Sequence, residues 1–200
     1  RKNLIKEPLY DFISCGSKNP DKTFYVIRRS PGAGLFSNVI YVLNHLEIAE
    51  KHNFIPVVDM ENYPTIYNEK KIINNTKNSW LYYFEPLSKY TLEEVYKSKN
   101  VILSKNRFYD NFSHKIYKKK SLLKLSNKII VKKKIKLKAE KFIKQNQISK
   151  NKILGIHYRG TSYKDAANHP FPPTYDQLVK KINNLIKKKR FSKIFFSRIT

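Results

Sequence analysis

Cysteine is almost absent from this 200-residue chain, which holds only Cys15. A single cysteine excludes an internal disulfide and any zinc site built from several thiolates. It is typical of a reduced thiol in a cytoplasmic protein, so we expect that location. No apolar stretch approaches the ~20 residues that cross a bilayer, and no signal peptide is visible. The chain starts at Arg1 and its only methionine is Met60, so we expect a trimmed N-terminus.

Acidic residues are also scarce. Fifteen Asp and Glu face 41 Lys and Arg, which gives a formal net charge of +26. The segment 115–152 alone holds fifteen lysines against one acid, Glu140, and could bind nucleic acid. Only seven of the 41 bases are arginine, the residue best suited to phosphate and base recognition. We therefore favour a solvated lysine surface and keep a basic nucleic-acid-binding protein as the alternative.

The remaining composition predicts a folded α/β protein. Hydrophobic residues make up 40% of the chain and aromatic residues 14%, which is enough for a core. Residues Thr23–Arg29 are β-branched and aromatic and predict a strand. A helix is expected over Phe36–Asn53 with Ser37 as its N-cap, and a second strand over Ile55–Met60. Strand, helix and strand in this order form a βαβ unit with parallel strands.

Further elements extend this pattern toward the middle of the chain. Thr91 and Glu94 have the spacing of a capping box, Val101–Ser104 reads as a strand, and Lys132–Gln147 as a helix. The aromatic run Trp80–Phe84 could line a sugar surface, but core packing is the better interpretation. We expect an N-terminal α/β domain over residues 1–148 and the start of a second, Rossmann-like domain over residues 149–200.

The most informative stretch follows this boundary. Ile153–Tyr158 is apolar and predicts a buried parallel strand, in which Gly155 would let a neighbour pack closely. Polar residues follow at once, so Arg159 is expected at the carboxyl end of the strand, where open α/β sheets hold their ligands. A capping box at Thr174 then begins a helix, and Ile194–Ile199 reads as another strand.

The sequence H-Y-R-G-T at residues 157–161, followed by D-A-A-N-H-P at residues 165–170, resembles the donor-site motif of the α1,6-fucosyltransferase family, within the GDP-fucose-using fucosyltransferases. That motif reads His-x-Arg-Arg-Thr-Asp-Lys, then a short gap, then Glu-Ala-Ala-x-His-Pro. Gly160 stands in place of the second arginine, Ser162 in place of the aspartate, and Asp165 in place of the glutamate. The resemblance is strong over about twenty residues and extends to the rest of the chain only in layout.

The resemblance implies a GT-B-like fold of two Rossmann-like halves, the second of them incomplete, and transfer of fucose from GDP-fucose to a sugar hydroxyl with inversion. It implies that Arg159 stabilises the GDP leaving group and that Asp165 is the base. The implied donor-binding residues are His157, Arg159, Gly160, Thr161, Gly32, Gly34 and Asn38. No metal or other cofactor is expected, and no D-x-D motif is present.

The glycines need separate treatment, because P-G-A-G at residues 31–34 is a weak motif by itself. It lacks the third glycine of the dinucleotide fingerprint and the Gly-Lys-Ser/Thr of a P-loop, so a plain turn is the simpler interpretation.

A second alternative function is an enzyme of unrelated chemistry that holds a phosphate on Arg159. The acceptor glycan and the oligomeric state cannot be read from the sequence. We expect the 200-residue chain alone to be an inactive fragment.

Overall fold

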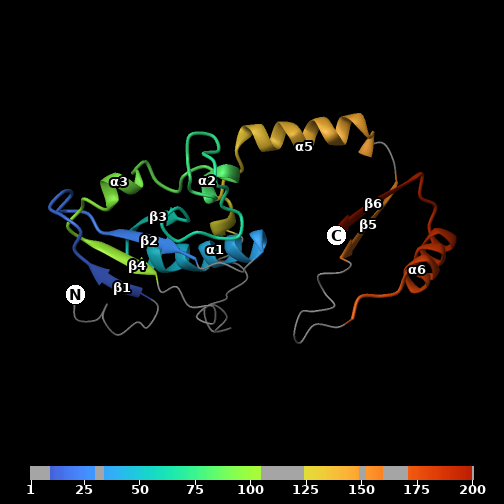
Figure 1. The fold of residues 1–200 in the computed structure, drawn as a ribbon, viewed down its shortest axis with the longest axis horizontal. Helices are drawn as coiled ribbons and strands as arrows, with labels where there is room; N and C mark the ends of the chain where they lie inside the picture. The colour runs from blue at the N-terminus through green and yellow to red at the C-terminus, as the bar shows by residue number, and fades with distance from the viewer. Residues whose placement is uncertain (1–9, 30–33, 105–123, 149–151, 160–170, 200) are drawn as a thin grey trace. The chain divides into compact units, whose positions relative to one another are not determined.

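The computed structural model describes residues 10–29, 34–104, 124–148, 152–159 and 171–199 (Figure 1). The chain forms two compact units, residues 1–135 and residues 136–200. Each unit is described by itself below. The division between them falls inside helix α5, and a domain boundary after residue 148 stays a prediction.

The first unit is built on a four-stranded sheet with the order β1-β4-β2-β3. Strand β2 runs parallel to both β3 and β4, as the predicted βαβ unit requires, and β1 is antiparallel to β4. The strands are β1 (Tyr10–Ile13), β2 (Phe24–Arg28), β3 (Ile55–Asp59) and β4 (Val101–Ser104). The helices are α1 (Leu35–Lys51), α2 (Trp80–Tyr83) and α3 (Leu92–Val95).

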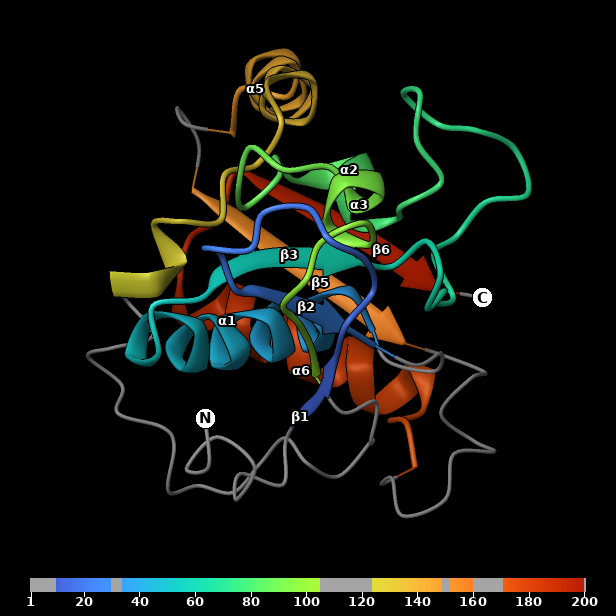
Figure 2. The same ribbon diagram turned by 90° about the vertical axis from the view of Figure 1, so that its left-hand side faces the viewer.

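Both faces of this sheet are covered, because the side chains of β2 alternate between two apolar clusters. Tyr25 and Ile27 pack with α1, whereas Phe24 and Val26 pack with Val95 of α3. These four side chains are fully buried, as expected of a strand with neighbours on both sides, and Arg28 at the end of β2 is partly buried. Figure 2 shows α1 along one side of the sheet and α3 on the other. The aromatic run of α2 is also in the core, which confirms the packing interpretation of Trp80–Phe84.

Helix starts were predicted with mixed success. The capping box at Thr91 is present: its side chain accepts a hydrogen bond from Glu94 N, and Glu94 bonds back to Thr91 N. The prediction that Ser37 caps α1 is wrong, because α1 begins earlier and its N-cap is Gly34 in extended conformation. A glycine offers no side-chain acceptor, and the first free amide, Leu35 N, donates instead to the Tyr67 hydroxyl at 2.8 Å.

Among the described residues no strand pairs with the outer edge of β3. Side chains form hydrogen bonds with its backbone groups instead. Asn78, which is buried, donates from Nδ2 to Val58 O at 2.7 Å and accepts from Met60 N at 3.3 Å. Its Oδ1 also accepts from Trp80 N at 3.2 Å, so one amide joins β3 to α2. Pro56 lies in the same strand and has no amide to offer, which suits an edge position.

We expect Asn78→Ala to lower the free energy of unfolding of the first unit by about 3 kcal/mol, because one buried carbonyl and two amides would lose their partner. Urea unfolding followed by the fluorescence of Trp80, the only tryptophan, reports this unit. Asn184→Ala, at an exposed position of α6, is the matched control and should change stability by less than about 0.5 kcal/mol. An unchanged urea midpoint for Asn78→Ala would show that the edge needs no such cap.

The second unit contains two parallel strands and two helices, and its elements confirm the predicted strand–helix–strand order. They are α5 (Lys133–Gln145), β5 (Ile153–Arg159), α6 (Tyr175–Lys188) and β6 (Lys193–Ile199). Strand β5 pairs in parallel with β6 over its whole length, from Ile153 opposite Lys193 to Arg159 opposite Ile199. The capping box between Thr174 and Gln177 is present at the start of α6.

Few of the described side chains in the second unit pack against one another. The Phe142 ring of α5 lies 5.7 Å from Phe195, and Tyr175 of α6 lies 5.4 Å from Tyr158. No residue of α6 is buried, and Val179 on its apolar stripe is 51% exposed. A side chain added at Gly155 would meet nothing within 4 Å, so the close packing expected at Gly155 is not found there. That the second half is incomplete stays a prediction.

Candidate functional site

The carboxyl end of β5 carries the residues that the sequence singled out. Arg159 is the last residue of β5, so the prediction that the strand delivers Arg159 to its carboxyl end is confirmed. His157 lies two residues earlier, is exposed, and pairs with Ser197 of β6. The strand forms because apolar Ile153, Leu154 and Ile156 precede these polar residues.

The remaining predicted residues of this motif, Gly160, Thr161 and Asp165, lie outside the described residues, as does Gly32. Their roles therefore stay predictions. His157 and Arg159 belong to the second unit, whereas Gly34 and Asn38 belong to the first, and each pair is described within its own unit.

Gly34 and Asn38 lie together at the start of α1. Gly34 is the N-cap, and Asn38 N donates to Gly34 O at 3.0 Å as the first bond of the helix. The Asn38 side chain is 2% exposed, and its Oδ1 has no hydrogen-bond partner among the described residues. The Tyr67 hydroxyl, which accepts from Leu35 N, covers the same helix end. The start of α1 is therefore polar and ordered, with the sequence-predicted asparagine inside it.

A buried carboxylate at the end of β3 was not found from the sequence. Asp59 is fully buried and accepts from Glu61 N at 3.1 Å, from Asn62 N at 2.9 Å and from Asn62 Nδ2 at 2.9 Å. The two backbone amides donate to Oδ1, and the Tyr96 hydroxyl donates at 2.6 Å to Oδ2, which also accepts from Asn62 Nδ2. Burial, together with this bond to a carboxylate, raises the pKa of Tyr96. Because its oxygens accept four hydrogen bonds, Asp59 anchors the loop after β3.

A second buried polar group lies between β2 and α1. The Arg29 guanidinium is 4% exposed and lies 4.6 Å from the centre of the Tyr41 ring. Burial lowers the pKa of Arg29. His45 Nδ1 is 2.6 Å from the Tyr25 hydroxyl, and burial followed by the nearby Arg29 charge lowers the pKa of His45 to about 3. His45 is therefore neutral at physiological pH and acts as a structural hydrogen-bonding group.

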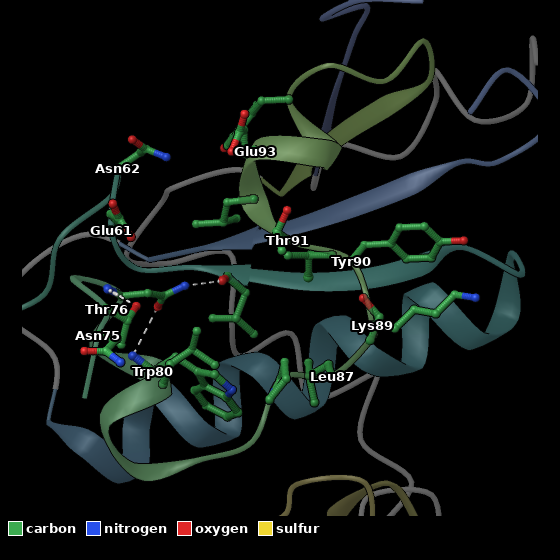
Figure 3. A pocket seen from close by; sticks show the side chains of 18 residues that line it. Glu61, Asn62, Asn75, Thr76, Trp80, Leu87, Lys89, Tyr90, Thr91 and Glu93 are labelled. Atoms are coloured by element: carbon green, nitrogen blue, oxygen red, sulfur yellow. Dashed lines mark hydrogen bonds between the residues drawn. The ribbon is translucent and has the colours of Figure 1, made fainter. Parts of the chain in front are cut away.

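A cavity of about 710 Å³ lies in the first unit beside the outer edge of β3 (Figure 3). Its wall includes the aromatic side chains of Trp80, Tyr90 and Tyr96. Glu61 and Asn62, which follow the carboxyl end of β3, line it as well. Trp80 belongs to the aromatic run that the sequence analysis considered as a sugar-lining surface, but the cavity itself was not predicted, because several separate segments build it.

Other kinds of site find little support in the described part of the chain. No three His, Cys, Asp or Glu side chains gather there as a metal site would require, and the expected absence of metal and other cofactors stays a prediction. Burial raises the pKa of the Cys15 thiol, so it lacks the character of an activated nucleophile. No helix among these residues has both the length and the apolar character needed to cross a bilayer.

Parallel strands with polar residues at their carboxyl ends place both units in the α/β class that holds ligands at such ends. Among solved structures, the fold is similar to that of the fucosyltransferase NodZ from Bradyrhizobium, with a TM-score of 0.53 and 12% sequence identity. It is also similar to a NodZ α-1,6-fucosyltransferase crystal soaked with GDP-fucose, with a TM-score of 0.54 and 12% identity. Each match covers 90% of this chain and 72% of the other.

These matches establish a likeness of fold. No protein-family model matches the chain, and no curated protein sequence matches it. The likeness agrees with the α/β architecture predicted from the sequence. Nothing in the comparisons favours the alternative of a nucleic-acid-binding protein.

Proposed function

We propose that the protein is a glycosyltransferase with a GT-B-like fold, which transfers fucose from GDP-fucose to a sugar hydroxyl with inversion. The observation that supports this most directly is the position of Arg159 at the carboxyl end of a parallel strand, inside a motif that resembles a GDP-fucose donor site. Two solved structures of similar fold are fucosyltransferases, and one of those crystals was soaked with GDP-fucose.

The proposed chemistry requires a cation beside the donor phosphates. As the bond between fucose C1 and the β-phosphate oxygen breaks, GDP departs with additional negative charge. A guanidinium held at that oxygen stabilises the transition state more than the ground state. Arg159 is proposed for this role because its planar fork can donate two hydrogen bonds to phosphate. His157, Gly160 and Thr161 are proposed to hold the donor beside it.

The residues at the start of α1 are proposed as donor-binding residues on the basis of the same family resemblance. A helix N-terminus favours anions because its first amides point outward. Gly32 and Gly34 would let the phosphates approach the backbone, and Asn38 would supply a polar group. Support comes from the buried Asn38 oxygen, which has no partner among the described residues.

The acceptor hydroxyl must lose its proton as its oxygen attacks fucose C1, and Asp165 is the proposed base. We expect Asp165→Asn in the full-length protein to lower kcat by about 10²–10⁴-fold, the usual contribution of a general base. The dissociation constant for GDP-fucose should change little, because the base acts on the acceptor.

A transfer assay with GDP-fucose, paired with titration calorimetry of the donor, separates these two quantities and tests the proposed function. Asp176→Asn, in the first turn of α6, is a matched control for loss of one carboxylate. An unchanged kcat in Asp165→Asn would assign the base to another residue. Failure of the full-length protein to bind GDP-fucose at all would reject the proposed function.

A further inference from the structure

The cavity beside β3 has the size of a ligand site. Its volume of about 710 Å³ lies within the range of about 300–1,000 Å³ that such sites occupy. Figure 3 shows Glu61 and Asn62 toward one end and Lys89 and Tyr90 toward the other. The cavity therefore extends along β3 from the carboxyl end of the sheet, the edge at which α/β proteins hold ligands.

The charges in the cavity exclude a strongly anionic ligand. The chain as a whole carries a net charge of +26, yet the lining contains two carboxylates, Glu61 and Glu93, and one cation, Lys89. Glu93 forms an ion pair with Lys97, and Lys89 lies 5.6 Å from the centre of the Tyr90 ring. No arginine lines the cavity, so it lacks the groups that hold phosphates. Most of the other polar groups are amides and hydroxyls, which pair with hydroxyl groups.

The aromatic wall is rigid. Tyr96 is fixed by its hydrogen bond to Asp59, and the Tyr90 ring packs edge-on against Phe24 at 4.9 Å. Trp80 is 2% exposed and supports the wall from within the core, so Tyr90 and Tyr96, which are partly exposed, supply the aromatic surface. Such preformed aromatic surface beside polar groups suits a ligand with apolar C–H faces and many hydroxyls.

Ser88, in the wall of the cavity, has a hydroxyl group without a hydrogen-bond partner among the described residues. Its Oγ is buried, and buried hydroxyls in folded proteins nearly always have a partner. Nearby, Asn62 donates to Asp59 through Nδ2, which leaves its carbonyl oxygen available to accept. A ligand hydroxyl in the cavity would pair with the Asn62 carbonyl oxygen.

We infer that this cavity is a binding subsite for a neutral oligosaccharide. Resting on the proposed function, the subsite holds the acceptor glycan, whereas the donor phosphates bind elsewhere. The cavity lies entirely within the first unit, so its sugar binding does not depend on the second unit.

The test uses the fluorescence of Trp80, which lines the cavity and is the only tryptophan of the 200-residue chain. The chain is titrated with maltotetraose, cellotetraose and chitotetraose, and separately with GDP. We expect a saturable change with at least one neutral tetrasaccharide and none with GDP. No saturable response to any of the three sugars, or a response to GDP alone, would overturn the inference.

Two variants localise the binding. Ser88→Leu fills the cavity and should weaken sugar binding at least about tenfold, whereas Ser88→Ala removes only the hydroxyl and should weaken it several-fold. Ser17→Leu, at an exposed position outside the cavity, is the matched control and should bind as the unaltered chain does. Unchanged affinity in Ser88→Ala together with Ser88→Leu would place the sugar elsewhere and overturn the inference.

The experiments can reject the sugar-binding subsite and the proposed transfer reaction independently of each other. GDP-fucose binding is measured by calorimetry on the full-length protein, independently of Trp80. If the donor binds but no tetrasaccharide does, the subsite is wrong and the donor reaction stands. If a tetrasaccharide binds in the cavity and GDP-fucose does not bind, the protein is a sugar-binding module and the proposed transfer reaction is wrong.

Discussion

Arg159→Ala in the full-length protein is expected to reduce kcat for fucose transfer by about 10²–10³-fold, the loss seen when one donor to a developing oxyanion is removed. The reason is the proposed role of Arg159, which ends β5, in stabilising the departing phosphate. Arg159→Lys should fail almost as badly, because an ammonium cannot replace a planar fork that donates two parallel bonds.

The measurement is steady-state transfer from GDP-fucose at saturating donor. Arg190→Ala is the matched control, since Arg190 is an exposed arginine of the same unit that follows α6. Its kcat should equal that of the unaltered protein. A kcat near the unaltered value in either Arg159 variant would remove Arg159 from the mechanism.

Acid is expected to destabilise the first unit through His45. In the folded state the pKa of His45 is lowered from 6.5 to about 3, mainly by burial, and in the unfolded chain it returns to its ordinary value. Below pH 6.5 the unfolded state therefore binds a proton that the folded state does not. The contribution of His45 to stability is complete above pH 6.5 and is lost as the pH falls toward 3. The slope is about 1.4 kcal/mol per pH unit.

Urea unfolding followed by Trp80 fluorescence between pH 7 and pH 4 measures this slope. His45→Gln should show a shallower dependence than the unaltered chain, because glutamine does not titrate while it can still bond to the Tyr25 hydroxyl. His52→Gln, at the end of α1, should retain the full slope. Identical slopes in His45→Gln and the unaltered chain would show that His45 is protonated in the folded protein.

The regular parts of the fold could be predicted because their signals are local. β-branched and aromatic runs predicted β2, β3 and β5, and the two capping boxes predicted the starts of α3 and α6. Ser37 failed as a cap because a hydroxyl on Tyr67, thirty-two residues away, satisfies the helix amide. Strand β1 was missed because it is short and gains its stability from pairing with β4.

The parts of the site that depend on neighbouring residues were predictable, and the parts that depend on distant residues were not. The position of Arg159 was predictable because a strand and the polar residue that ends it are adjacent in sequence. The anchoring of Asp59 by Tyr96, and the edge cap by Asn78, depend on contacts between residues distant in the chain. Residues 62–78 are polar, but their composition does not reveal that they close the edge of β3 or line a cavity.

The antiparallel pairing of β1 with β4 bears on the order in which the protein assembles during its synthesis. Tyr10 pairs with Ser104, so β1 leaves the ribosome long before its partner exists. In contrast, β2, α1 and β3 follow one another directly and can form their βαβ unit early, since closing a short loop costs less entropy. Until β4 is made, β1 is an unpaired strand open to wrong partners. Although β1 precedes the other described strands in the chain, it is therefore the last of them to join the sheet of the first unit.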